Sequence, residues 1–152
     1  MATNSLFTSG QIFNGIGNII KYKGEHKDWF GNIVNVPYPP KVGTRERHSF
    51  LHLNALKPST RSSGGIVYRG LNHKGGEIQW IVAWDNRADV TENLVYTEVR
   101  APAKVDWDVI EQKLPLNQNS SNYDGCFTHI SITDGDFPEI QAVLMPKSKS
   151  KN

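Results

Sequence analysis

Three consecutive runs in the middle of the chain have the composition of β-strands. They cover residues 64–70, 79–84 and 94–100, and turn-forming residues separate them. Runs rich in Val, Ile, Tyr and Trp between Gly and Asn clusters are typical of antiparallel strands, and Asn72-His73-Lys74-Gly75-Gly76 predicts a hairpin between the first two. None of the runs contains a recognisable catalytic motif. The sequence therefore favours a small binding protein over an enzyme.

The second of these runs has apolar residues on both of its faces. Alternation places Ile78, Trp80, Val82 and Trp84 on one face and Gln79, Ile81, Ala83 and Asp85 on the other. A strand that is apolar on both sides lies inside a sandwich or under a helix. We expect Trp80 to belong to the core.

Further strands and one helix are predicted on either side of this region. Strands are expected near residues 18–23, at 48–53, at 126–133 and at 140–145, with a turn at 24–28 and a polar loop at 117–125. In the strand at 48–53, Ser49, Leu51 and Leu53 are expected to face the core. Residues 106–114 have helical spacing, with Asp106 as a possible cap. The predicted fold is mainly β, a single-domain antiparallel β-sandwich with one short helix.

The 152 residues suit one domain with one core. We expect an N-terminal arm at residues 1–11, the sandwich at 12–145 and a basic flexible tail at 146–152. The formal net charge is +2, and Lys147, Lys149 and Lys151 lie in that tail. No aromatic residue interleaves with these lysines, so a solvated tail is favoured over a nucleic-acid partner.

Cysteine content and hydropathy indicate the compartment. Cys126 is the single cysteine of the chain, so an intrachain disulfide is impossible and a reducing compartment fits. The first residues lack the pattern of a secretory signal, and no run approaches the ~20 apolar residues of a membrane span. We expect a cytoplasmic protein without a transmembrane segment.

Neither a metal site nor a nucleophile is well supported. His48 and His52 share a strand face but need a third ligand to hold a metal. Cys126 and His129 are three residues apart in a strand, so their side chains diverge, and Cys126 is better explained as a buried hydrophobe. We expect no metal and no cofactor. Calcium at the acidic turns around residues 85–92 and 134–136 stays an open alternative.

The candidates for ligand binding are aromatic and polar residues in probable loops and strand ends. Large apolar rings in such places are covered either by the loop itself or by a ligand. The predicted partner is a carbohydrate, a lipid headgroup or a protein. The binding candidates are Trp29, Phe30, Tyr38, Trp84, Asp85, Asn86 and Arg87.

Several short motifs, in order and spacing, resemble the 23 kDa jasmonate-induced protein family of plants. The match runs from about Ile12 to Leu144. Its motifs are residues 14–18 (NGIGN), 28–31 (DWFG), 37–39 (PYP), 50–52 (FLH), 67–70 (VYRG), 80–84 (WIVAW) with Asn86, 96–100 (YTEVR) and 125–126 (GC).

This resemblance implies a cytosolic plant stress or defence protein without established catalytic activity, and it assigns no functional residue. A more distant likeness to aegerolysin and actinoporin-like sandwiches implies the alternative, a membrane-lipid-binding defence protein. The chain has no obvious amphipathic N-terminal helix for pore formation. An enzyme with unrecognised chemistry is a third possibility.

Overall fold

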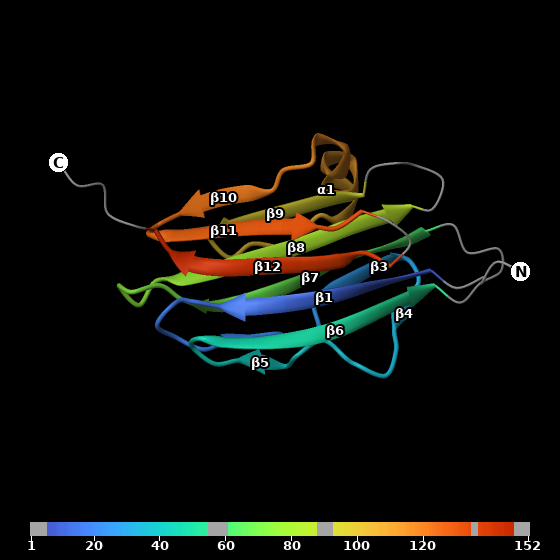
Figure 1. Ribbon diagram of the computed structural model, residues 1–152. Helices are drawn as coiled ribbons and strands as arrows, with labels where there is room; N and C mark the ends of the chain where they lie inside the picture. The colour runs from blue at the N-terminus through green and yellow to red at the C-terminus, as the bar shows by residue number, and fades with distance from the viewer. Residues whose placement is uncertain (1–5, 55–60, 88–92, 135–136, 148–152) are drawn as a thin grey trace, which may run out of the picture.

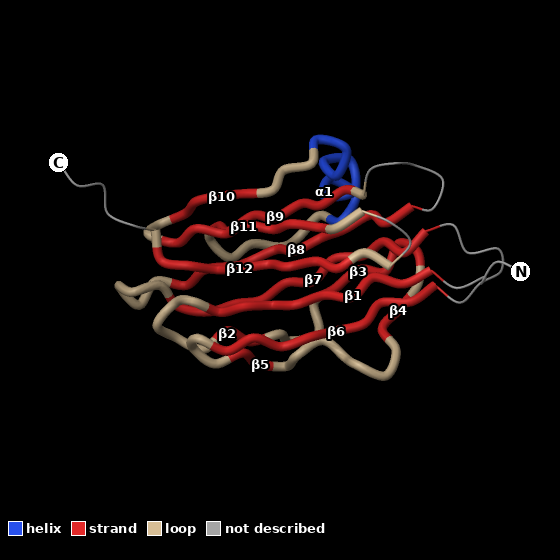
Figure 2. The backbone as a smooth tube through the Cα atoms, in the orientation of Figure 1, coloured by secondary structure: helices blue, strands red, loops and turns tan. Residues whose placement is uncertain are grey.

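The computed structural model describes residues 6–54, 61–87, 93–134 and 137–147, and strands dominate it (Figure 2). The mainly β fold with one short helix is confirmed. The elements are β1 (Leu6–Asn14), β2 (Ile20–Lys21), β3 (His26–Phe30), β4 (Asn32–Ile33), β5 (Lys41–Val42), β6 (Glu46–Asn54), β7 (Arg61–Leu71), β8 (Glu77–Arg87), β9 (Leu94–Arg100), α1 (Trp107–Lys113), the 3-10 turn η1 (Leu114–Leu116), β10 (Ser120–Tyr123), β11 (Cys126–Ile132) and β12 (Glu139–Pro146).

These strands form two sheets that face each other, as the β-sandwich prediction requires (Figure 1). Sheet I has the order β10-β11-β12-β1-β6-β4, and sheet II has the order β5-β2-β7-β8-β9 with β3 also paired to β7. The pairings among the described strands are antiparallel apart from β1 with β12. The predicted hairpin is β7–β8, in which Tyr68 lies opposite Trp80.

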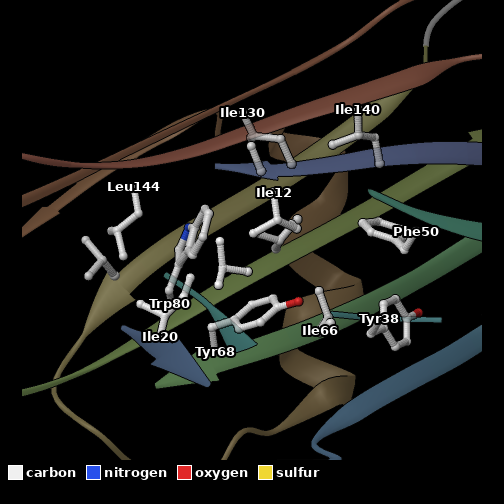
Figure 3. Close-up of a cluster of buried hydrophobic side chains, with 14 of the residues drawn as sticks. Ile12, Ile20, Tyr38, Phe50, Ile66, Tyr68, Trp80, Ile130, Ile140 and Leu144 are labelled. Atoms are coloured by element: carbon white, nitrogen blue, oxygen red, sulfur yellow. The ribbon is translucent and has the colours of Figure 1, made fainter. Parts of the chain in front are cut away.

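The main core lies between the two sheets and is built around large rings (Figure 3). Trp80 is 1% exposed, which confirms it as a core residue. Its Nε1 donates to Oγ1 of Thr128 on sheet I at 2.6 Å and lies 3.1 Å from Oγ1 of Thr97 on sheet II. A buried indole N–H needs such a partner, because an unpaired buried donor is costly.

A second, smaller core lies on the outer face of sheet II. Ile81 and Ala83 of β8 are covered there by Ile110 of α1 and by Leu114. The helix begins after Asp106, whose side chain accepts from the backbone N–H groups of Asp108 and Val109. Both apolar faces of β8 are therefore buried, since one face lies inside the sandwich and the other lies under the helix.

The N-terminal part of the chain differs from the sequence prediction. Residues 6–11, expected in an arm, belong to β1, which pairs with both β6 and β12. The inward side of β1 includes Thr8, Gly10 and Asn14 beside Leu6 and Ile12, and this mixture hides the strand pattern. At the other end, β12 runs to Pro146, and residues 148–152 of the expected tail lie outside the described residues.

The predicted core face of β6 is wrong. Phe50 and His52 point inward and are buried, whereas Leu51 and Leu53 are half-buried and Ser49 is exposed. Phe50 occupies the space left by the missing side chain of its cross-strand neighbour, since a Cβ atom on Gly10 would lie 2.1 Å from the Phe50 ring. Two hydrogen-bond partners, described below, compensate the burial of His52.

Two smaller predictions also need correction. Strand β3 begins at His26, inside the expected turn at 24–28, and strand β10 occupies residues 120–123 of the expected polar loop. Both are edge strands with polar sequences, for which composition gives a weak strand signal. The pairing partner of β3, β7, is distant in the chain. The partner of β10 is β11, which follows the two-residue turn Asp124-Gly125.

Candidate functional site

A pocket opens on the outer face of sheet II, where β2 lies beside the end of β7 and the start of β8. It encloses about 450 Å³. Its lining includes three cationic side chains, one acidic side chain and two exposed aliphatic side chains: Lys21, Lys23, Arg69, Glu77, Ile19 and Leu71. A concave site with apolar walls and a few polar groups is typical of ligand binding.

The register of the strands positions these cations. Lys21 of β2 lies opposite Arg69 of β7, and their neighbours Ile20 and Tyr68 are buried in the main core. Because side chains alternate along a strand, Lys21 and Arg69 point outward. Gly70 permits the close approach of β2, since a Cβ atom there would lie 3.0 Å from Cγ2 of Ile20.

The pocket is electropositive. Among the lining residues, Lys21, Lys23 and Arg69 face one carboxylate, that of Glu77. Outside the lining, Nη2 of Arg69 lies 3.8 Å from Oε1 of Glu25, which is a long ion pair between half-exposed groups. Lys and Arg side chains converging on one place donate well to phosphate or carboxylate oxygens. The site can therefore hold an anionic group.

Aliphatic side chains border the same cations. Ile19 is 44% exposed and Leu71 is 41% exposed. Exposed aliphatic groups beside Lys and Arg allow one ligand to place a charged part on the cations and an apolar part beside them.

A chain of buried polar groups lies elsewhere, between the two sheets. Asp28 Oδ1 is 3.0 Å from His52 Nε2, and His52 Nδ1 is 2.8 Å from Ser62 Oγ. Thr8 Oγ1 donates to Ser62 Oγ at 2.9 Å. On the outer side, Asp28 Oδ2 is 3.2 Å from Nε2 of His26. The chain joins β3 to β6, β7 and β1.

These residue types are those of a serine hydrolase, but their burial points to a structural role. His52 and Ser62 are both 0% exposed, so neither side chain touches the surface where a substrate would bind. Burial alone raises the pKa of Asp28, but the hydrogen bond from His52 and the charges of His52 and His26 bring that pKa below its usual value. The carboxylate is thus held ionised between two imidazoles.

Most of the binding residues predicted from sequence are interior. Trp84, Asp85, Asn86 and Tyr38 are 0%, 3%, 1% and 6% exposed, so the expectation that they form a surface patch is wrong. Tyr38 sits in a loop, as expected, but its ring packs 5.1 Å from that of Phe50. Such burial leaves these four side chains almost no surface for a ligand.

The strand-end candidates have structural partners instead. Asp85 accepts two hydrogen bonds from the Arg61 guanidinium, both at 2.9 Å. Asn86 donates to the backbone oxygen of Phe7 at 3.1 Å, which ties β8 to β1. Arg87 is half-buried at the end of β8. Beyond it, residues 88–92, with the calcium candidates Asp89 and Glu92, lie outside the described part of the chain.

Trp29 and Phe30, like the half-buried Arg87, are predicted site residues that retain some exposed surface. Trp29 is half-buried and packs edge to face on Trp107, with 5.9 Å between ring centroids. Phe30 is 39% exposed, and the Arg61 guanidinium lies 4.4 Å from its ring centroid. The structure brings neither of them to the cationic pocket, and their binding role stays a prediction.

Among the described residues, no group of three or more His, Cys, Asp or Glu side chains is arranged so that it could hold a metal ion. His48 is exposed and lies 2.9 Å from Glu46, whereas His52 is buried in the polar chain. Cys126 is 2% exposed and His129 points outward, as expected. Burial raises the pKa of the Cys126 thiol, with a smaller effect from Asp124, which disfavours a reactive thiolate.

Sequence reasoning missed the cationic pocket. The local signal was the pair Lys21 and Lys23, which alternation places on one side of a short strand. Arg69 and Glu77 belong to strands more than forty residues further along the chain, and only sheet pairing brings them to the same place.

The chain matches a known protein family over nearly its whole length. Residues 3–147 match the model of the Nakanori-like protein family. The chain is a member of this family.

Two curated plant proteins are relatives of this Nakanori-like chain. A jasmonate-induced protein homolog of Atriplex canescens is 31% identical over 124 residues, covering 78% of the chain and 66% of the relative. The 23 kDa jasmonate-induced protein of Hordeum vulgare is 25% identical over 136 residues, covering 86% and 64%. The resemblance to jasmonate-induced proteins is thereby confirmed, although the chain spans slightly less than two thirds of either relative.

Solved structures share the Nakanori-like fold. The crystal structure of the lipid-binding protein Nakanori matches with a TM-score of 0.79 and 17% identity, covering 92% of this chain and 71% of that one. The Xerocomus chrysenteron lectin XCL matches with a TM-score of 0.53 and 13% identity, covering 92% and 97%. At such identities the likeness establishes the β-sandwich alone.

No described helix is long and apolar enough to cross a membrane.

Proposed function

We propose that this chain is a non-catalytic binding protein that takes the polar headgroup of a membrane lipid in the pocket beside β2. The observation that carries the proposal is the mixed lining, in which Lys21, Lys23 and Arg69 stand next to exposed Ile19 and Leu71. A lipid presents a charged headgroup and an apolar remainder in this arrangement. The fold shared with a lipid-binding protein supports it.

The non-catalytic part of the proposal rests on the buried polar chain. Ser62 and His52 are the described residues that most resemble catalytic groups, and both are sealed between the sheets. General-base and nucleophilic chemistry requires a side chain within hydrogen-bond reach of the substrate. The cationic pocket offers positioning groups without a nucleophile and base in contact.

The biological setting is part of the same proposal. Both curated relatives carry names that refer to jasmonate induction, and they support a plant stress or defence protein. A cytoplasmic location remains our prediction from the single cysteine. Fractionation and immunoblotting of jasmonate-treated and untreated tissue test both points.

Co-sedimentation with vesicles of plant polar lipid tests the binding. The wild type is expected to pellet with vesicles, and the paired change Ile19→Ser with Leu71→Ser is expected to weaken this. The control is Val109→Ser on α1, a residue that is 40% exposed and does not line the pocket. Failure of the wild type to pellet with any vesicle, or equal weakening by the control, would reject the proposal.

A carbohydrate ligand is the second candidate, and one observation favours it. Trp29 and Trp107 are both half-buried and pack edge to face, with 5.9 Å between ring centroids, so part of this indole pair reaches the surface. Exposed indole surface can stack on a sugar ring. A glycan array separates the two candidates, since a glycan hit lost in Trp29→Phe supports this second site.

A further inference from the structure

Three cationic side chains lie directly opposite one another on neighbouring strands of sheet II. Lys41 of β5 pairs with Lys21 of β2, and Lys21 pairs with Arg69 of β7. All three are exposed, and the alternate residues Ile20 and Val42 are buried in the main core. The three side chains therefore emerge together on the outer face, and we call them the cationic row.

The isolated protein has little to offset the repulsion within this row. Like charges directly opposite each other on adjacent strands destabilise a sheet. Glu77 lines the same pocket as Lys21 and Arg69, Glu25 reaches Arg69 at 3.8 Å, and the charge of Lys41 acts on Glu46. The Glu46 carboxylate already has a partner, because its Oε2 lies 2.9 Å from Nε2 of His48. Neither Lys21 nor Lys41 has an ion-pair partner in the described part of the chain.

We infer that the cationic row binds the anionic headgroups of a membrane surface. This inference rests on the proposed function and names its lipid class. Phosphate and carboxylate oxygens accept hydrogen bonds from several Lys and Arg side chains at once, and their charge removes the repulsion between the three cations. Binding to anions therefore offsets the repulsion that destabilises the cationic row in the free protein.

The surroundings of the row favour a membrane over other anionic partners. Lys21 and Arg69 also line the pocket, together with Lys23 and the exposed Ile19 and Leu71. None of the described residues that line the pocket is aromatic, so the pocket offers no ring on which nucleic-acid bases would stack. The row spans two strand spacings, about 10 Å, so it faces more than one headgroup at a time.

Vesicle binding of two variants with the same net charge tests the inference. The site variant is Lys21→Gln with Arg69→Gln, and the control is Arg47→Gln with Lys113→Gln. Arg47 lies on β6 of sheet I and Lys113 ends α1, and neither belongs to the row or to the pocket lining. Phosphatidylcholine vesicles with and without phosphatidylserine are the probes, at low and raised salt.

The wild type is expected to prefer phosphatidylserine vesicles and to lose that preference at raised salt. The site variant is expected to bind these vesicles about 25-fold more weakly, at about fivefold for each cation, with the control close to wild type. Because the site variant removes repulsion between cations, its melting temperature should be unchanged or higher than that of the wild type. Loss of binding is then separable from loss of folding.

Each other outcome decides against the inference in a distinct way. Equal weakening of both variants would assign the effect to net charge. Binding to phosphatidylcholine alone, with no gain from phosphatidylserine, would leave the proposed function standing and reject the anionic preference. Full competition by inorganic phosphate at constant ionic strength would indicate a free-anion site, and tight oligonucleotide binding lost in the site variant would indicate nucleic acid. No binding to any vesicle would reject the proposed function as well.

Discussion

Trp80 on sheet II donates a hydrogen bond from its indole Nε1 to Oγ1 of Thr128 on sheet I, at 2.6 Å. The bond crosses the interior of the sandwich, and both residues are almost fully buried. Thr128 in turn donates to the backbone oxygen of Val143 and lies 3.0 Å from Oγ1 of Thr97. The indole N–H of Trp80 and the hydroxyl of Thr128 are thus both satisfied in the interior, and their bond fixes how the two sheets face each other.

Trp80→Ala is expected to lower the free energy of unfolding by about 3–5 kcal/mol, because it leaves a large cavity and two threonine hydroxyls without the indole donor. Trp80→Phe keeps most of the apolar volume and should cost less. Urea denaturation monitored by far-UV circular dichroism measures both changes. A near-normal midpoint for Trp80→Ala would contradict the position of the ring.

Gly65→Ala is expected to displace the Trp107 ring from sheet II. A Cβ atom at Gly65 would lie 2.5 Å from Cζ3 of Trp107, and the ring must move to make room. Such overpacking costs about 1–3 kcal/mol. The shift should also appear in tryptophan fluorescence.

Gly17→Ala is the matched control for this change. Its added Cβ atom meets nothing within 4 Å, so this variant should keep the wild-type stability and emission maximum. The same fluorescence shift in both variants would show that the contact between Gly65 and Trp107 does not cause it.

Stability should fall in acid because of Asp28. Its pKa is lower in the folded protein than the ordinary value of about 3.9, so the folded state binds this proton less readily than the unfolded chain. The resulting stabilisation is fully present above pH about 4 and is lost as the pH falls through the folded pKa. Unfolding free energies measured across this range should show a shallower acid limb for Asp28→Asn. Identical limbs for the variant and the wild type would contradict the role of Asp28.

Arg61→Met should be more harmful than the half-buried position of Arg61 suggests. The guanidinium makes two hydrogen bonds to Asp85, whose side chain is 4% exposed. Removing the cation leaves a buried carboxylate unpaired, which costs about 3 kcal/mol. Adding Asp85→Asn should recover part of the loss. A double-mutant cycle measures the coupling, and strict additivity of the two changes would show that the pair contributes nothing.

The residues that sequence reasoning placed correctly are those with a local pattern. Alternation along 77–84 predicts the two apolar faces of β8, and the spacing after Asp106 predicts α1. His52 shows the limit of this reasoning. Composition marks the leucines on its strand as interior, yet the imidazole is buried because Asp28 and Ser62 supply its hydrogen bonds from other strands.

The candidate site lay almost wholly outside the reach of the sequence. Trp84, Asp85 and Asn86 have the chemistry of a binding patch, but Trp84 packs on Phe50 and His52, and Asp85 is paired with Arg61. A ring, a carboxylate and an amide serve a core network as well as a ligand, so composition cannot distinguish the two uses.

The amino-acid order by itself determined the strands β7, β8 and β9, the start of the short helix, and the inward position of Trp80 and Cys126, because these depend on side-chain periodicity over a few residues. Only the tertiary structure decided that β1 lies beside β12, that Phe50 and His52 face the interior, and that Lys41, Lys21 and Arg69 stand in one row. Strand neighbours and their register are set by contacts between residues far apart in the chain, and no local pattern records them.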